Sequence, residues 1–230
     1  ILQTRLNQIQ EYADVHQLKL NKKKTKVMSF NTSRKYDFLP KLTIGGEQLE
    51  VVDQTKLLGV MISNDLKWNQ HIEYIVKKAR KRFWYLRRLS ILGASTDTLM
   101  DIYHSTTRCL MEDTAPVFAG ALTKTNCEDL EHVQKGAFKI ILRGNYRDYN
   151  NALEILDQET LEVRRKAISL KFAKKNFNHP KMKHLFPIRK NNSTRRGPKF
   201  VEKWFPTTRA QNGPINYLIR LLNESWDKKL

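Results

Sequence analysis

The acidic residues of this chain are too scattered to form a recognisable catalytic centre. Two-metal phosphoryl transfer needs clustered carboxylates, usually close in sequence, to hold two Mg²⁺ ions. The 230 residues include 23 acidic residues but no Asp-Asp pair. The sequence also lacks the GxxxxGK[ST] phosphate cradle, the zinc-binding HExxH motif and the GxSxG nucleophile elbow. We therefore predict no complete catalytic site, no metal site and no cofactor within these residues.

The cysteines and histidines do not supply a site either. Cys109 and Cys127 form no CxxC pair and no zinc-ligand pattern with the six histidines. His104 and Cys109 lie five residues apart on one predicted helix and so do not face each other. No apolar run approaches a membrane span, and the first residues have no signal-peptide pattern. These features favour a reducing intracellular compartment, nucleus or cytoplasm, and no membrane partner.

The basic residues carry the stronger signal. The formal net charge is +19, from 42 Lys and Arg against 23 Asp and Glu. Residues 66–92 hold eight basic residues and one acid, and residues 161–203 hold fourteen basic residues and two acids. Because acids are nearly absent there, pairs at i,i+4 cannot neutralise the charge. A phosphate backbone is the natural counter-charge, with an anionic membrane surface as an alternative.

The apolar patterning predicts an α+β fold with an antiparallel, strand-rich beginning. We expect a helix over residues 1–15, short strands at 18–20 and 25–30, and a polar loop after them. The Gly45-Gly46 pair predicts a hairpin between residues 42–44 and 48–52. The apolar run KLLGVMI at residues 56–62 has the length of one strand.

The rest of the chain is predicted to be mostly helical. A helix over residues 67–92, capped by Asn64 or Asp65, has an apolar stripe from Trp68 to Leu89 in steps of three and four. We expect residues 179–214 to form an extended basic segment, unordered without nucleic acid. Three parts follow from these patterns: a strand-rich part at 1–63, a helical part at 64–143 and a basic helical extension at 144–230.

Further helices are expected in the second and third parts. The first runs from the cap at Ser95 to Met111, with an interruption or restart at Pro116. The others cover residues 127–142 (ended by Gly144), 151–156, 161–177 and 215–223.

The chain carries six short motifs in the order LKLNKKKT, KLLGVMI with LKWNQHI, KARKRFWYLRRL, APVF, LEHVQK, and LEVRR with FAKK. Together they resemble the end of the palm and the thumb of non-LTR (LINE, jockey-like) retrotransposon reverse transcriptases. LKLNKKKT at residues 18–25 resembles the motif D region, and KLLGVMI followed by LKWNQHI resembles the primer-grip region. KARKRFWYLRRL at residues 78–89 resembles the start of the thumb. Downstream, APVF (with Phe118 where the family usually has Trp), LEHVQK and LEVRR followed by FAKK complete the series.

The resemblance implies a piece of an RNA-directed DNA polymerase. The catalytic carboxylates, their Mg²⁺ ions and the upstream polymerase domains of the family are missing; Tyr12-Ala13-Asp14 continues with Val15 and does not make a YxDD loop. Lys24 matches the motif D lysine, a candidate proton donor or phosphate contact, and Leu58, Gly59 and Val60 match the primer grip. The partner implied is an RNA–DNA hybrid. The predicted nucleic-acid contacts, with Trp84 or Tyr85 as stacking candidates, are Lys77, Lys78, Lys81, Arg82, Arg88, Arg164, Arg165, Lys174 and Lys175.

Two other interpretations stay open. Residues 56–89 also resemble a short amino-terminal module of AlkB-homologue sequences, which favours a domesticated basic module that binds nucleic acid or protein without polymerase activity. A membrane-surface protein is the third, because the helix over 67–92 carries Trp and Phe among its Lys and Arg residues. Because the sequence begins with Ile1, we expect the chain to be a fragment of the longer polymerase.

Overall fold

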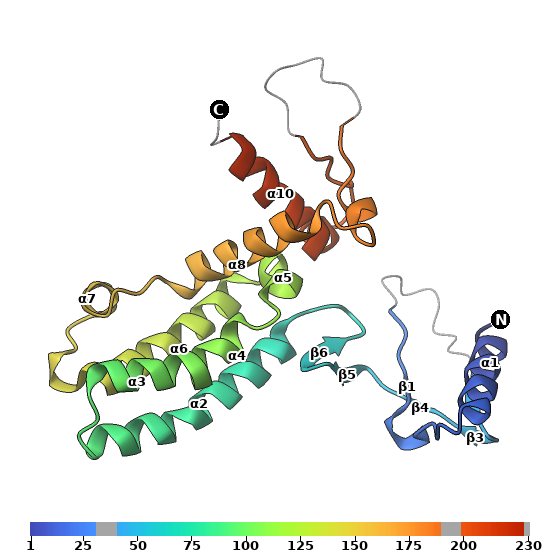
Figure 1. Ribbon diagram of the computed structural model, residues 1–230, viewed down its shortest axis with the longest axis horizontal. Helices are drawn as coiled ribbons and strands as arrows, with labels where there is room; N and C mark the ends of the chain where they lie inside the picture. The colour runs from blue at the N-terminus through green and yellow to red at the C-terminus, as the bar shows by residue number, and fades with distance from the viewer. Residues whose placement is uncertain (31–40, 190–198, 228–230) are drawn as a thin grey trace. The chain divides into compact units, whose positions relative to one another are not determined.

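The computed structural model describes residues 1–30, 41–189 and 199–227 (Figure 1). The chain divides into two compact units, Ile1–His71 and Ile72–Leu230, and each is described by itself. The first unit combines one helix with short strands, and the second is helical, so the predicted α+β class is confirmed. The polar loop expected after residue 30 lies outside the described residues.

The first unit contains three separate two-stranded sheets beside helix α1 (Leu2–Val15) and the 3₁₀ turn η1 (Lys22–Lys24). The expected strand at 18–20 is absent, and the expected strand at 25–30 is reduced to two residues. One pair is parallel, so the wholly antiparallel prediction was wrong there. The pairs are β1 (Lys26–Val27) with β4 (Glu50–Val51), parallel; β2 (Thr43–Ile44) with β3 (Glu47–Gln48), antiparallel; and β5 (Gln54–Leu57) with β6 (Val60–Ser63), antiparallel.

The hairpin predicted around Gly45-Gly46 is confirmed. Both glycines have positive φ, 54° and 77°, as a two-residue type I′ turn requires. The Gln3 side chain of α1 reaches across to Thr43, donating to its carbonyl and accepting from its N–H, both at 2.9 Å. Helix α1 is therefore tied to the hairpin by an amide that satisfies two main-chain groups at once.

The run at residues 56–62 forms a hairpin and not the single strand that its hydrophobicity predicted. Leu58 and Gly59 are its two turn residues, with φ of 47° and 92°, and β5 and β6 pair on either side of them. The Leu58 side chain is 94% exposed, whereas Val60 is buried. The turn thus presents a leucine to solvent at a backbone conformation that L-residues rarely adopt.

The second unit is built from helices of very different lengths (Figure 1). Ser95 caps α3 as predicted, accepting from the Thr98 N–H at 3.2 Å. A π-helical turn, η2 (Tyr103–Arg108), interrupts the helix predicted to run to Met111, and Pro116 begins α5 in its first turn. The helices are α2 (Asn69–Ile91, beginning in the first unit), α3 (Thr96–Ile102), α4 (Cys109–Glu112), α5 (Ala115–Phe118), α6 (Lys124–Leu142), α7 (Tyr149–Ile155), α8 (Leu161–Asn176), α9 (Thr208–Gln211) and α10 (Pro214–Asp227), with 3₁₀ turns η3 (Ala119–Ala121), η4 (Arg143–Asn145) and η5 (Lys183–Leu185).

The apolar stripe predicted for α2 forms its buried face. Ile72, Ala79 and Leu86 are at most 1% exposed, and Phe83 is 7% exposed. Gly136 of α6 gives this face room, because a Cβ there would lie 2.9 Å from the Phe83 ring. The predicted caps, Asn64 and Asp65, lie in the turn before α2, which begins at Asn69. In that turn the Asp65 carboxylate accepts from the Lys67 N–H and from the Ser63 hydroxyl.

The expectation that residues 179–214 are unordered was wrong for the described part of that segment. Phe186 and Phe200 are at most 2% exposed and pack with Ala173 of α8 and with Leu218, Ile219 and Leu222 of α10. Asn223 clamps Phe200, donating to its carbonyl and accepting from its N–H at 3.0 Å. Large aromatic side chains and the amphipathic α10 therefore give this basic segment a core of its own, while residues 190–198 lie outside the described residues.

Gly120 and Gly144 provide a matched test of the packing between η3 and α10. A Cβ at Gly120 would overlap the Tyr217 side chain and lie 2.9 Å from the Asn212 carbonyl oxygen, whereas one at Gly144 meets nothing within 4 Å. We predict that Gly120→Ala lowers the free energy of unfolding by about 1–3 kcal/mol through overpacking, measured by denaturant titration of the helical circular dichroism signal. Gly144→Ala should change it by less than about 0.5 kcal/mol, and equal effects of the two would contradict this packing.

Candidate nucleic-acid interface

The outer face of α2 carries a straight row of cations and one aromatic residue. Lys77, Lys81, Trp84 and Arg88 follow one another in steps of four, three and four, which places them along one side of a helix. All four are exposed, and Trp84 is 61% exposed. We call these four residues the α2 row. They lie opposite the buried stripe, so core packing leaves their side chains free to contact a partner.

The charge of the α2 row is not neutralised within the part of the chain that the structure describes. No ion pair within 4.0 Å is found there for Lys77, Lys81 or Arg88. Lys77 and Lys81 share the wall of a surface hollow with Arg80, a basic residue that the sequence analysis did not select, and with Glu73. The face therefore concentrates positive charge where solvent or a ligand must supply the counter-ion.

Two exposed aromatic rings lie on the same side of α2. Trp84 and Tyr85 meet edge to face with ring centroids 5.1 Å apart, and Tyr85 is 48% exposed. Phe83, by contrast, is in the core, where Arg87 lies 6.0 Å from its ring centroid. An exposed Trp between lysines and arginines combines a flat stacking surface with cations, the pairing typical of proteins that bind nucleic-acid strands.

The other predicted contacts on α2 and α8 differ in their exposure. Lys78 and Arg82 are half-buried at the flank of α2, closer to the core than the α2 row. On α8, Lys174 and Lys175 are exposed, and Lys171, which the sequence analysis did not select, lies one turn before them on the same face. The exposed end of α8 is thus a second, smaller basic surface.

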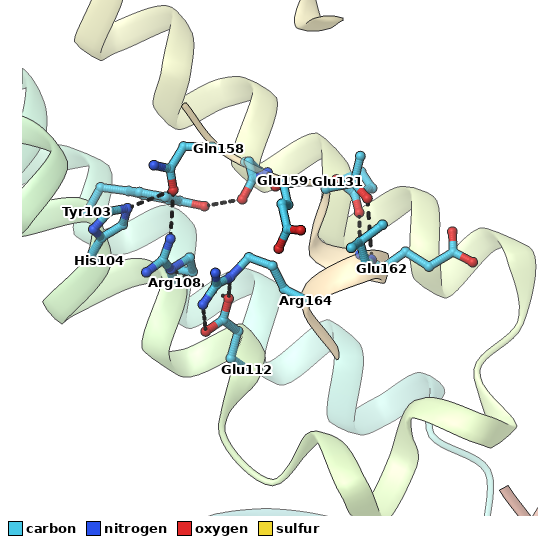
Figure 2. Close-up of polar contacts among 12 residues, drawn as sticks. Tyr103, His104, Arg108, Glu112, Glu131, Gln158, Glu159, Glu162 and Arg164 are labelled. Carbon is cyan, nitrogen blue, oxygen red and sulfur yellow. Dashed lines mark hydrogen bonds and ion pairs between the residues drawn. The ribbon is translucent and has the colours of Figure 1, made fainter. Parts of the chain in front are cut away.

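Arg164 and Arg165 are not available to a nucleic-acid backbone. The Arg164 guanidinium is held by both carboxylate oxygens of Glu112, and Arg108 also approaches that carboxylate, at 3.5 Å (Figure 2). Glu112 raises the pKa of Arg164 by this hydrogen bond, whereas burial lowers the pKa of Arg108. Arg165, the next residue on α8, is only 2% exposed. The predicted contacts of these two arginines with a duplex are therefore corrected: both point into the helical unit.

Glu112 belongs to a wider polar network between the π-helical turn and the segment before α8. Gln158 accepts from Arg108 at 2.8 Å and also contacts His104 (Figure 2). Burial and the nearby guanidinium of Arg108 lower the pKa of His104, so it stays neutral at pH 7. Nearby, the buried Tyr103 hydroxyl donates to Gln134 at 2.6 Å, and burial raises its pKa. These groups therefore satisfy one another by hydrogen bonds within the helical unit.

The remaining predicted site residues lie on two separate elements of the first unit, the 3₁₀ turn η1 and the β5–β6 hairpin. Lys24 ends η1 and is exposed, and its N–H is bound by the Asn21 side chain at 3.1 Å. The neighbouring cations of that basic turn are engaged, Lys22 with Glu47 at 2.9 Å and Lys26 with Glu50. Leu58 and Gly59 form the β5–β6 turn described above, with Val60 turned inward.

The described residues contain neither a cluster of metal ligands nor a membrane-spanning helix. Over residues 1–30, 41–189 and 199–227, no group of three or more His, Cys, Asp or Glu residues is arranged to hold a metal ion. None of the described helices combines the length and apolar character needed to cross a bilayer. None of the protein-family models matches the chain, and the searches of curated proteins and of solved structures returned no match.

Glu112 allows a direct test of the network. We predict that Glu112→Gln lowers the free energy of unfolding by about 2–4 kcal/mol, because two partly buried guanidiniums then lose their shared carboxylate. Glu128 makes a matched control, since its i,i+4 pair with Lys124 is exposed and 4.0 Å long. Glu128→Gln should cost no more than about 0.5 kcal/mol, and an equally mild Glu112→Gln would mean that the arginines find other partners.

Proposed function

We propose that this chain binds nucleic acid, an RNA–DNA hybrid in particular, through the outer face of α2. The observation that carries the proposal is the α2 row: three exposed cations without ion pairs in the described ranges, with Trp84 between them. Lysine and arginine contacts to phosphates release condensed counter-ions and do not depend on base sequence. A stacked Trp84 adds affinity that is equally tolerant of sequence, because every base offers a π-face.

We further propose that the parent protein is a reverse transcriptase of a non-LTR retrotransposon, of which this chain is the end of the palm and the thumb. The support is the ordered series of six motifs. One of them, KARKRFWYLRRL at residues 78–89, lies wholly within α2. In this proposal Lys24 contacts a phosphate or donates a proton, and the turn at Leu58 and Gly59 approaches the primer end. The Mg²⁺-binding carboxylates of the family would belong to residues outside this sequence.

An anionic membrane surface would compete for the same cations, and the packing of α2 argues against it. An interfacial helix inserts a broad apolar face into the lipid. The apolar face of α2, including Ile72, Ala79 and Leu86, is buried in the helical unit. The large apolar side chains of α2 left exposed are Trp84, Tyr85 and, at the last residue of the helix, Ile91, which is less than the broad apolar face that insertion needs. Anionic vesicles therefore serve as the comparison ligand in the binding experiments.

Salt dependence tests the role of the lysines in the α2 row. We predict that Lys77→Met with Lys81→Met lowers the slope of log K against log salt for an RNA–DNA hybrid by about 2, since each lost phosphate contact contributes about 0.9. The control removes the same charge from two exposed, ion-paired lysines, Lys124→Met with Lys166→Met. Fluorescence anisotropy over a salt series measures both, and equal slopes for the two double variants would contradict the proposal.

Stacking by Trp84 is tested by a second pair of variants. We predict that Trp84→Ala weakens binding of a hybrid with a single-stranded extension by about 5- to 100-fold, because one base loses its aromatic platform. Trp204 is 79% exposed outside α2, so Trp204→Ala controls for the loss of an exposed indole and should leave affinity unchanged. A Trp84→Ala protein that binds as tightly as the wild type would restrict the interface to electrostatic contacts.

A further inference from the structure

Exposed apolar side chains lie on the segment that leads from the β-bridge between Ile188 and Phe200 toward α9. Trp204 is 79% exposed, and Val201 and Phe205 are exposed near it in the sequence. Ile188 is also exposed, and its antiparallel bridge to Phe200 brings it next to Val201. We call Ile188, Val201, Trp204 and Phe205 the aromatic patch. A group of exposed apolar side chains of this kind is typical of a surface that docks another molecule.

Side-chain amides hold the main chain on both sides of Trp204. Asn216 of α10, which is buried, donates to the Lys203 carbonyl at 2.6 Å and accepts from the Lys203 N–H at 3.1 Å. The Phe205 N–H donates to the Gln211 side chain at 3.0 Å. The exposed indole is therefore carried by main chain that is already ordered, which lowers the entropic cost of binding a partner there. Tryptophan is also among the residue types most enriched at the centres of protein interfaces.

The main chain of Trp204 offers a partner one donor and one acceptor. Its N–H and C=O make no hydrogen bond with the residues that the structure describes. A polypeptide can accept from the first and donate to the second, as it does when a strand is added to an exposed edge. Phosphates only accept, and the aliphatic Ile188 and Val201 give bases no ring on which to stack. The surface therefore suits a polypeptide better than a nucleic-acid strand.

The charge around the aromatic patch is positive. Lys203 and Arg189 are exposed and make no ion pair within 4.0 Å in the described ranges. Glu202, which precedes Lys203, is already engaged, 3.3 Å from Arg220. A partner that carries carboxylates would therefore complement this surface.

We propose that the aromatic patch binds an acidic segment of a partner protein. An apolar side chain of that segment packs on the Trp204 indole, its main chain pairs with the N–H and C=O of Trp204, and its carboxylates face Lys203 and Arg189. The flanking apolar side chains exclude water around this anchor. The inference goes beyond the proposed function, because it needs neither the α2 row nor a nucleic acid.

A short synthetic peptide of alternating glutamate and valine is the probe for this surface. We expect the fluorescently labelled peptide to bind saturably to the full 230-residue chain, as measured by fluorescence anisotropy. Trp204→Ala should weaken this binding about 10- to 100-fold, because it removes the anchor. Trp84→Ala removes the exposed indole of α2 and should bind the peptide as the wild type does. Both indoles are exposed, so both variants should keep the helical circular dichroism signal.

Two altered peptides test the charge and the main-chain contacts separately. Lysine in place of every glutamate should abolish binding, because the peptide then repels Lys203 and Arg189. N-methylation of alternate amides keeps the side chains and removes main-chain donors, and should weaken binding about 3- to 10-fold. The proposal is overturned if the wild type does not bind the glutamate peptide saturably, if Trp204→Ala binds it as tightly, or if either altered peptide binds equally well.

Hybrid binding distinguishes this proposal from the one for α2. Lys77→Met with Lys81→Met should leave peptide binding unchanged, and Trp204→Ala should leave the affinity for an RNA–DNA hybrid unchanged. A single-stranded oligonucleotide that displaces the peptide, and whose own binding Trp204→Ala weakens, would assign the aromatic patch to nucleic acid and overturn the proposal. Each surface can therefore fail its own test without affecting the result for the other.

Discussion

One carboxylate, that of Glu112, neutralises two arginines where the π-helical turn and α4 meet α8. Helix α8 packs against α4, α5, α6 and α10, so its position affects most of the second unit. In a chain with a net charge of +19, such contacts are favoured where a cation brought into the interior has an anionic or polar partner. Arg108 and Arg164 meet that condition through Glu112, and much of the helical packing depends on it.

The same requirement explains which cations are left exposed. Neutralisation is needed inside the unit and not on its surface, where water screens each charge. The α2 row lies on the outer side of a helix whose opposite face is buried, so Lys77, Lys81 and Arg88 reach solvent, with no ion pair within 4.0 Å in the described ranges. Arg165 is the exception, a buried cation for which the described residues provide no carboxylate within 4.0 Å.

Local patterns predicted the elements well where one short-range interaction decides the outcome. The Gly45-Gly46 turn, the Ser95 cap and the long amphipathic α2 all follow from neighbouring residues, and all three are present. The turn at Leu58 and Gly59 was missed because five of the seven residues of the run at 56–62 suit a buried strand. A left-handed leucine there is set by the pairing of β5 with β6, which hydrophobicity does not encode.

The candidate site divides in the same way. Helical periodicity places the α2 row on one side and the apolar stripe on the other, so the exposure of Lys77, Lys81 and Arg88 could be predicted, whereas Lys78 and Arg82 are half-buried. The inward orientation of Arg164 and Arg165 could not be predicted from the sequence. Adjacent residues on a helix point about 100° apart, and the partner of Arg164 is 52 positions away. Tertiary contacts, and not composition, decide that one meets Glu112 and that the other is buried.

Chemical modification of lysines in the full chain, with and without an RNA–DNA hybrid, tests the central claim most directly. Acetylation rates at individual lysines, followed by mass spectrometry, report which amines a bound hybrid covers. The α2 interface predicts that the hybrid slows modification of Lys77 and Lys81 while Lys124, whose side chain is 92% exposed, reacts at an unchanged rate. Unchanged rates at Lys77 and Lys81 under saturating hybrid would contradict it.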